Sequence, residues 1–90
     1  MLLFLYRYAL EIITIFLSIV NSVKVVRRSS GEPAKGKKVA LGMSTGVTDG
    51  EWTDSNGEAH FNVSPNHGKV FVDGSKEHEG HLSGKIVVYI

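Results

Sequence analysis

The chain has 90 residues, a length that fits one domain with one small hydrophobic core. Ten Lys and Arg residues oppose nine Asp and Glu residues, so the formal charge of +1 offers no general basic excess for binding nucleic acid. The absence of cysteine excludes disulfides, thiolate metal ligands and a cysteine nucleophile. We therefore expect a small module with no cofactor and with no nucleic acid as its partner.

The first 20 residues form the most apolar segment of the chain. Sixteen of them are apolar, and the segment contains neither Gly nor Pro. As an α-helix it would be about 30 Å long, which matches the hydrocarbon core of a bilayer. Arg7 and Glu11 interrupt it at i, i+4 spacing, so they share one face and can neutralise each other. The pattern predicts one long apolar helix over residues 1–21 that serves as a membrane anchor.

Three other interpretations of this segment stay open. It resembles a secretory signal peptide, although no basic region precedes the apolar stretch. It also fits a helix buried among its own copies, as in a pilin-like filament, or a soluble helix that caps the domain. The anchor and filament interpretations predict a protein at a membrane or at the cell surface. Its partners would be the membrane, copies of itself or other surface proteins.

A basic cluster follows the apolar segment. Six basic residues lie between residues 21 and 38, against a single acidic residue, whereas residues 39–90 carry three Lys against seven acidic residues. Positive charge beside a membrane span favours the cytoplasmic side and can contact anionic headgroups; the alternative is a solvated strand face and loop. The opposite charges of the two parts favour head-to-tail contacts between copies. The basic cluster comprises Lys24, Arg27, Arg28, Lys35, Lys37 and Lys38.

From residue 22 onward the hydrophobic pattern is that of a β domain. All ten glycines lie between residues 31 and 84, and short β-branched runs alternate with turn clusters. Asn56-Gly57 predicts a type I′ hairpin turn, since both residues tolerate positive φ. After this turn, Ala59, Phe61 and Val63 are expected to face inward. Residues 22–90 are therefore predicted to form an antiparallel, immunoglobulin-like sandwich of six or seven strands. Strands are expected at 23–27, 38–43, 69–73 and 86–90.

Two stretches resemble carboxypeptidase regulatory-like and transthyretin-like domains. GEPAKGKKVAL (Gly31–Leu41) is similar to the Gly-x-Pro-x-x-Gly opening that follows the first strand of these domains. WTDSNGEAHFNV (Trp52–Val63) resembles their Thr-Asp-x-x-Gly signature. The resemblance covers about residues 23–74 and implies a seven-stranded sandwich, commonly extracytoplasmic, that acts as a folding support, adhesion module or attachment stalk. The signature residues are Thr53, Asp54, Asn56 and Gly57.

The residues of the enzymatic branch of this group are missing. That branch hydrolyses 5-hydroxyisourate with a histidine in the first strand and a C-terminal Tyr-Arg-Gly-Ser, whereas this chain has Val23–Val25 in the predicted first strand and ends Val88-Tyr89-Ile90. We therefore expect a non-enzymatic structural, adhesive or interaction module, tethered or assembled through the N-terminal helix. Binding is expected through loops or sheet edges, above all the terminal strand 85–90. The alternatives are a filament subunit and a metal- or small-ligand-binding domain.

His78, Glu79 and His81 are the candidate metal ligands of that last alternative. Imidazole and carboxylate groups suit Zn²⁺, Ni²⁺ or Cu²⁺, and His60 and His67 could approach from neighbouring strands. The segment is one residue short of the helical metalloprotease motif. The alternative is a set of exposed polar loop residues.

Oxygen ligands and aromatic rings supply two further candidates. The acidic loop contains Asp49, Glu51, Asp54, Asn56 and Glu58. Oxygen ligands at alternate positions suit Ca²⁺, but the EF-hand spacing is not met, and a hairpin with solvated edges explains the same residues. Trp52 and Phe71 are expected in the core, with stacking on a base or a sugar as the alternative.

Overall fold

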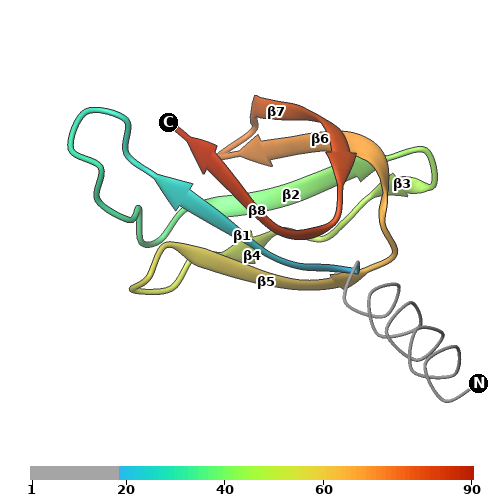
Figure 1. Ribbon diagram of the computed structural model, residues 1–90, viewed down its shortest axis with the longest axis horizontal. Helices are drawn as coiled ribbons and strands as arrows, with labels where there is room; N and C mark the ends of the chain where they lie inside the picture. The colour runs from blue at the N-terminus through green and yellow to red at the C-terminus, as the bar shows by residue number, and fades with distance from the viewer. Residues whose placement is uncertain (1–18) are drawn as a thin grey trace, which may run out of the picture.

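The computed structural model describes residues 19–90, which form eight β-strands in two sheets (Figure 1). None of these residues lies in a helix, so the described part holds no helix long and apolar enough to cross a membrane. The strands are β1 (Val20–Val26), β2 (Lys38–Met43), β3 (Gly46–Val47), β4 (Glu51–Trp52), β5 (Glu58–Val63), β6 (Asn66–Val72), β7 (Ser75–Leu82) and β8 (Gly84–Tyr89).

The strands divide into a three-stranded sheet A and a five-stranded sheet B. Sheet A has the order β5-β1-β8, with β1 antiparallel to β5 and parallel to β8. Sheet B has the order β3-β2-β6-β7, and β4 also pairs with β2; every pair in this sheet is antiparallel. The chain therefore returns at its C-terminus to lie beside its first described strand, as Figure 1 shows for β1 and β8.

The predicted fold, a six- or seven-stranded antiparallel sandwich preceded by a long apolar helix, is wrong in three respects. The described residues form eight strands, one pair is parallel, and no helix occurs among residues 19–90. Two of the eight strands, β3 and β4, have two residues each, too few to show a period in the sequence. The helix prediction for residues 1–18, with Arg7 and Glu11, lies outside the described residues.

β1 begins at Val20, inside the apolar run that was predicted to be helical. Val20 is fully buried and pairs with Val63 of β5 and Gly84 of β8. A run of β-branched residues is compatible with a buried strand as well as with a helix, so the hydrophobic pattern could not fix this boundary. The β body (residues 20–90) therefore includes Val20 and Asn21, two residues of the predicted helix.

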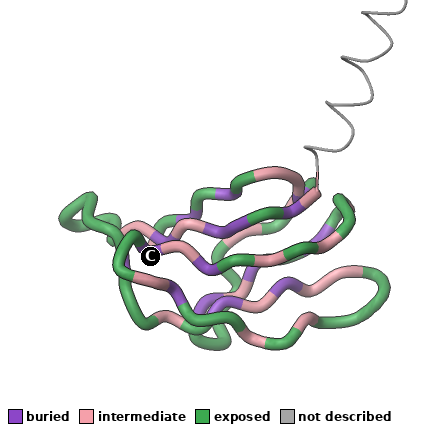
Figure 2. Tube along the Cα trace, turned by 90° about the horizontal axis from the view of Figure 1, so that it is seen from below, coloured by how far each residue is buried: buried purple, intermediate pink, exposed green. Residues whose placement is uncertain are grey.

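The core lies between the two sheets and consists mainly of valine. Buried positions alternate with exposed ones along the strands (purple and green in Figure 2), as expected when only one face of each sheet is covered. The predicted inward direction of Ala59, Phe61 and Val63 is confirmed, since the first is fully buried and the others pack against the core. The buried apolar residues are Val20, Val23, Val25, Ala34, Val39, Leu41, Ala59, Val70, Val72, Leu82, Ile86 and Val88. Among residues 19–90, the side chains that point away from the core are exposed or half-buried.

Trp52 is not a core residue. Its exposed fraction is 64%, because β4 pairs only with the beginning of β2 and places Trp52 opposite the exposed Lys38. Phe71 is half-buried and lies on the outer face of sheet B, between the inward-facing Val70 and Val72 of β6. The prediction that both rings belong to the core is therefore wrong for Trp52, and Phe71 lies outside the buried cluster.

Candidate functional site

The signature turn is built around the carboxylate of Asp54. Its Oδ1 accepts hydrogen bonds from the amides of Asn56 (2.9 Å) and Glu58 (3.1 Å). The Gly57 amide donates to the Asp54 carbonyl at 2.9 Å, so the turn runs from Asp54 to Gly57. Gly57 has a φ of 75°, whereas the only described non-glycine residue with positive φ is Asp73. The predicted type I′ turn centred on Asn56-Gly57 is therefore wrong, because the Asp54 side chain stabilises a turn one residue earlier.

Thr53 connects this turn to the loop that precedes β2 by hydrogen bonds. Its side chain is buried, with an exposed residue fraction of 4%. Thr53 Oγ1 accepts a hydrogen bond from the Lys37 amide at 2.8 Å and donates one to the Ala34 carbonyl at 2.6 Å. The signature residues therefore connect three segments of backbone, which is a structural role.

A three-residue cluster lies beside the turn on the outer face of sheet A. The ligand atoms of Asp54, Glu58 and His60 all lie within 4.8 Å of one another, and His60 Nε2 is 3.2 Å from Asp54 Oδ2. The Glu58 amide, and then the His60 side chain, hold the pKa of Asp54 below its usual value. Glu58 also forms an ion pair with Lys85 of β8. A cation would have to compete with this lysine and with the turn, so the cluster is already satisfied without one.

The fold brings only some of the side chains of the acidic loop close to one another. Of its predicted oxygen ligands, Asp54 and Glu58 come close to each other. They are joined by His60, which the sequence instead suggests as a partner of His78 and His81. Asp49 and Glu51 do not belong to this group. Among residues 19–90, this is the one group of three or more candidate ligands within 4.8 Å of one another.

The predicted ligands His78, Glu79 and His81 lie on a strand, not in a loop. All three belong to β7, where side chains alternate between the two faces of the sheet. His78 is half-buried and pairs with the inward-facing Val70, while Glu79 and His81 are exposed on the outer face. The residue directly opposite His81 is His67 of β6. The fold therefore separates His78 from His81 and pairs His81 with a histidine from the neighbouring strand.

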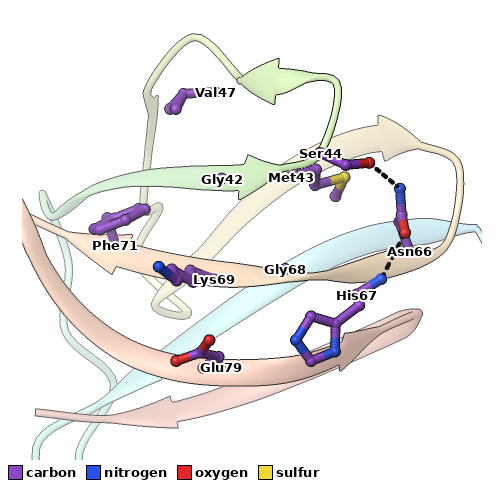
Figure 3. A pocket seen from close by; sticks show the side chains of 10 residues that line it. All are labelled: Gly42, Met43, Ser44, Val47, Asn66, His67, Gly68, Lys69, Phe71 and Glu79. Carbon is purple, nitrogen blue, oxygen red and sulfur yellow. Dashed lines mark hydrogen bonds between the residues drawn. The ribbon is translucent and has the colours of Figure 1, made fainter.

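A hollow of about 480 Å³ lies on the outer face of sheet B (Figure 3). Gly42 of β2 gives it depth, since a Cβ atom there would stand 2.9 Å from Cε2 of Phe71. On one side Asn66 Nδ2 donates to Ser44 Oγ at 3.2 Å. The lining residues are Gly42, Met43, Ser44, Val47, Asn66, His67, Gly68, Lys69, Phe71 and Glu79. The sequence does not predict this hollow, and its one signal there is a glycine within an alternating strand.

The basic cluster spreads over β1, β2 and the loop between them. Lys24 lies on β1 and Lys38 begins β2, while the other four residues lie in the connecting loop. Lys37 Nζ is 3.4 Å from Asp73 Oδ2. The Lys38 amide, followed by the Lys37 side chain, lowers the pKa of Asp73. The loop members are Arg27, Arg28, Lys35 and Lys37.

The free edge of β8 combines unpaired backbone with exposed apolar side chains. In the described part of the chain, β8 pairs with β1 on one side and with no strand on the other. The amides of Gly84 and Ile90 donate to carbonyls of Ile19 and Val26, both at 2.9 Å. Successive amides of a strand point to opposite edges, so those of residues 85, 87 and 89 point to the free edge. Val87 and Tyr89 have exposed fractions of 43% and 50%.

Neither a protein-family model nor a curated protein matches the chain. The resemblance of Gly31–Leu41 and Trp52–Val63 to carboxypeptidase regulatory-like and transthyretin-like domains therefore stays a prediction.

Proposed function

We propose that the chain is a non-enzymatic interaction module. Residues 1–18 would hold it at a membrane or within an assembly of copies, and the β body would pair with another polypeptide along β8. The observation that carries the proposal is the free edge of β8, with Val87 and Tyr89 exposed beside it. In strand addition, backbone hydrogen bonds supply affinity and alternate side chains supply specificity.

β8 has few of the devices that protect edge strands from pairing. Natural edges carry proline, bulges, inward-pointing charges or several lysines. β8 contains no proline, its inward residues Ile86 and Val88 are apolar, and Lys85 at its beginning is its one charged residue. The irregularity in the β1–β8 ladder falls on β1, between Val20 and Ser22. The edge is therefore regular along its length, which suits a pairing surface.

The partner that the sequence of β8 favours is a second copy of this chain. An antiparallel pair centred on Val87 would place this residue opposite Val87 of the second copy. Lys85 would then lie opposite Tyr89 of the second copy, and the same contact would occur twice. The side chain of Lys85 reaches across β1 to Glu58 of β5, away from the second copy, so its ammonium would stay with Glu58 and leave the tyrosine ring unopposed by charge. Valine and tyrosine also favour the extended conformation. Pairing of two β8 strands would join the sheets A of two copies into one continuous sheet.

The resemblance noted in the sequence agrees with this proposal. Carboxypeptidase regulatory-like and transthyretin-like domains act as folding supports, adhesion modules or attachment stalks, roles that need a rigid body and a binding edge more than a catalytic cleft. The opposite charges of residues 21–38 and 39–90 would strengthen further contacts between copies. Both features favour an assembling or adhesive module.

Disulfide cross-linking of the full chain in detergent tests the proposal, since the chain has no cysteine of its own. In a hydrogen-bonded antiparallel pair, opposite Cα atoms are about 5.5 Å apart, within the range that a disulfide spans. We expect Val87→Cys to form covalent dimers under mild oxidation. The matched control is Asn62→Cys, an exposed position on β5 at the other edge of sheet A.

The register provides a second check with the same chain. Lys85→Cys should not cross-link with itself, but it should cross-link when mixed with Tyr89→Cys. Equal dimer yields from Val87→Cys and Asn62→Cys would show random collisions within micelles and would contradict the proposal. An absence of dimers from Val87→Cys would also contradict it.

A further inference from the structure

We propose that His67 of β6 and His81 of β7 form a binding site for one divalent transition-metal ion on the outer face of sheet B. The two residues stand directly opposite each other in the β6–β7 ladder. Both side chains are exposed, and both lie on the face that carries the hollow, of which His67 is a lining residue (Figure 3). The site is independent of the free edge of β8, which belongs to the other sheet.

The register places the two imidazole rings within chelating reach. Opposite residues of an antiparallel pair have Cβ atoms about 4.5–5.5 Å apart. Two metal–nitrogen bonds of about 2.0–2.1 Å at a tetrahedral angle require nitrogens about 3.3 Å apart. Histidine side chains on neighbouring strands can meet this separation by rotation about their χ angles. The ladder is regular from Val70–His78 to Asn66–Leu82, so no bulge disturbs the pair.

The surroundings of the pair suit a cation with open coordination positions. Glu79 lies two residues before His81 on the same face, opposite Lys69. Its carboxylate is 3.0 Å from Lys76 Nζ, and both side chains are about half exposed, so this ion pair is weak and exchangeable. The hollow beside His67 leaves room for water molecules to complete the coordination sphere.

The donor set selects the class of metal. Imidazole nitrogen suits Cu²⁺, Ni²⁺ and Zn²⁺, whereas Ca²⁺ and Mg²⁺ prefer sites made of oxygen ligands. Within one set of nitrogen and oxygen ligands, Cu²⁺ binds more tightly than Ni²⁺ or Zn²⁺. We therefore take Cu²⁺ as the probe. The two remaining histidines of the chain lie elsewhere: His78 on the inner side of β7, and His60 beside Asp54 on sheet A.

The experiment is equilibrium dialysis of the untagged full chain in detergent against Cu²⁺, followed by electron paramagnetic resonance of the complex. We expect one equivalent of Cu²⁺, with nitrogen hyperfine structure from two imidazoles. His67→Ala and His81→Ala should each lower the affinity by more than about tenfold, since even the loss of a partner outside the ligand shell costs about 10–100-fold. Both positions are exposed, so these variants should retain the fold.

His78→Ala and His60→Ala are the matched controls, and both should bind Cu²⁺ as the unaltered chain does. A loss of affinity in His78→Ala as large as that in His81→Ala would overturn the proposal, because it would assign binding to histidines of β7 alone. A loss confined to His60→Ala would overturn it in favour of the turn cluster. The failure to bind one equivalent of Cu²⁺ would also overturn it.

Discussion

Two features of the signature turn require a glycine at position 57. Its φ of 75° lies in the left-handed region, and a Cβ atom at this position would stand 2.7 Å from the carbonyl oxygen of Val25. The Val25 amide in turn donates to the Gly57 carbonyl at 2.8 Å. The turn is therefore pressed against β1, and only a residue without a side chain fits there.

A comparison of Gly57→Ala with Gly31→Ala should separate the effect of the positive φ from that of the close contact with β1. A left-handed conformation costs an alanine about 1–2 kcal/mol. Gly31 has a φ of 74° with open space around it, so Gly31→Ala should lower the free energy of unfolding by about that amount alone. Gly57→Ala should lower it further, because the contact with Val25 is added. Urea unfolding of both variants measures the difference. Equal losses of unfolding free energy would show that the close approach to β1 does not affect stability.

Three exposed carboxylates should make the stability of the β body depend on pH. The pKa of Asp54 is lowered by the Glu58 amide and then by His60, and that of Asp73 by the Lys38 amide and then by Lys37. The pKa of Glu79 is lowered mainly by its hydrogen bond to Lys76.

The lowered pKa values determine how the free energy of unfolding changes with pH. Each group binds protons more weakly in the folded chain than in the unfolded chain, so its stabilisation is complete above the unfolded pKa of about 4. It is lost as the pH falls through the lowered folded values. Urea unfolding between pH 7 and pH 3 should therefore show a falling free energy in the acid range, with a shallower fall in Asp54→Asn. A profile that rises toward acid pH would contradict the assignment.

At the scale of the strands, the sequence predicts those elements whose hydrophobic pattern matches their burial. β2, with Val39 and Leu41 buried, and β8, with Ile86 and Val88 buried, follow a period of two that the sequence displays. The sequence predicts a loop rather than a strand at β7, because Leu82 is its one apolar residue. Its pairing with β6 makes it a strand, and no local pattern reveals such pairing.

The start of β1 provides a test at this scale. Val20 is fully buried and belongs to the core, whereas its neighbour Asn21 is exposed. Val20→Ala should lower the free energy of unfolding by about 2 kcal/mol, from the loss of buried apolar surface and the cavity left behind. Asn21→Ala should have a much smaller effect. Chemical denaturation compares the two, and a neutral Val20→Ala variant would show that the β body begins later in the chain.

For the whole molecule, sequence spacing predicts candidate site residues but not their partners across the sheets. The residue type makes His81 a candidate metal ligand, yet its neighbour across the sheet depends on the β6–β7 register, which no spacing rule supplies. The cluster of Asp54, Glu58 and His60 depends in the same way on a turn that brings two acidic residues beside a strand histidine. Long-range pairing therefore decides the sites, and the local sequence decides only which side chains are available.

Amide hydrogen exchange of the full chain, resolved by residue with NMR in detergent, tests the pairing edge of β8 most directly. At low protein concentration the amides of Ile86, Val88 and Ile90 should be protected by β1, while those of Val87 and Tyr89 should exchange freely. As the concentration rises and copies pair, the amides of Val87 and Tyr89 should become protected as well. Rapid exchange of these two amides at every concentration would contradict the pairing of copies along β8.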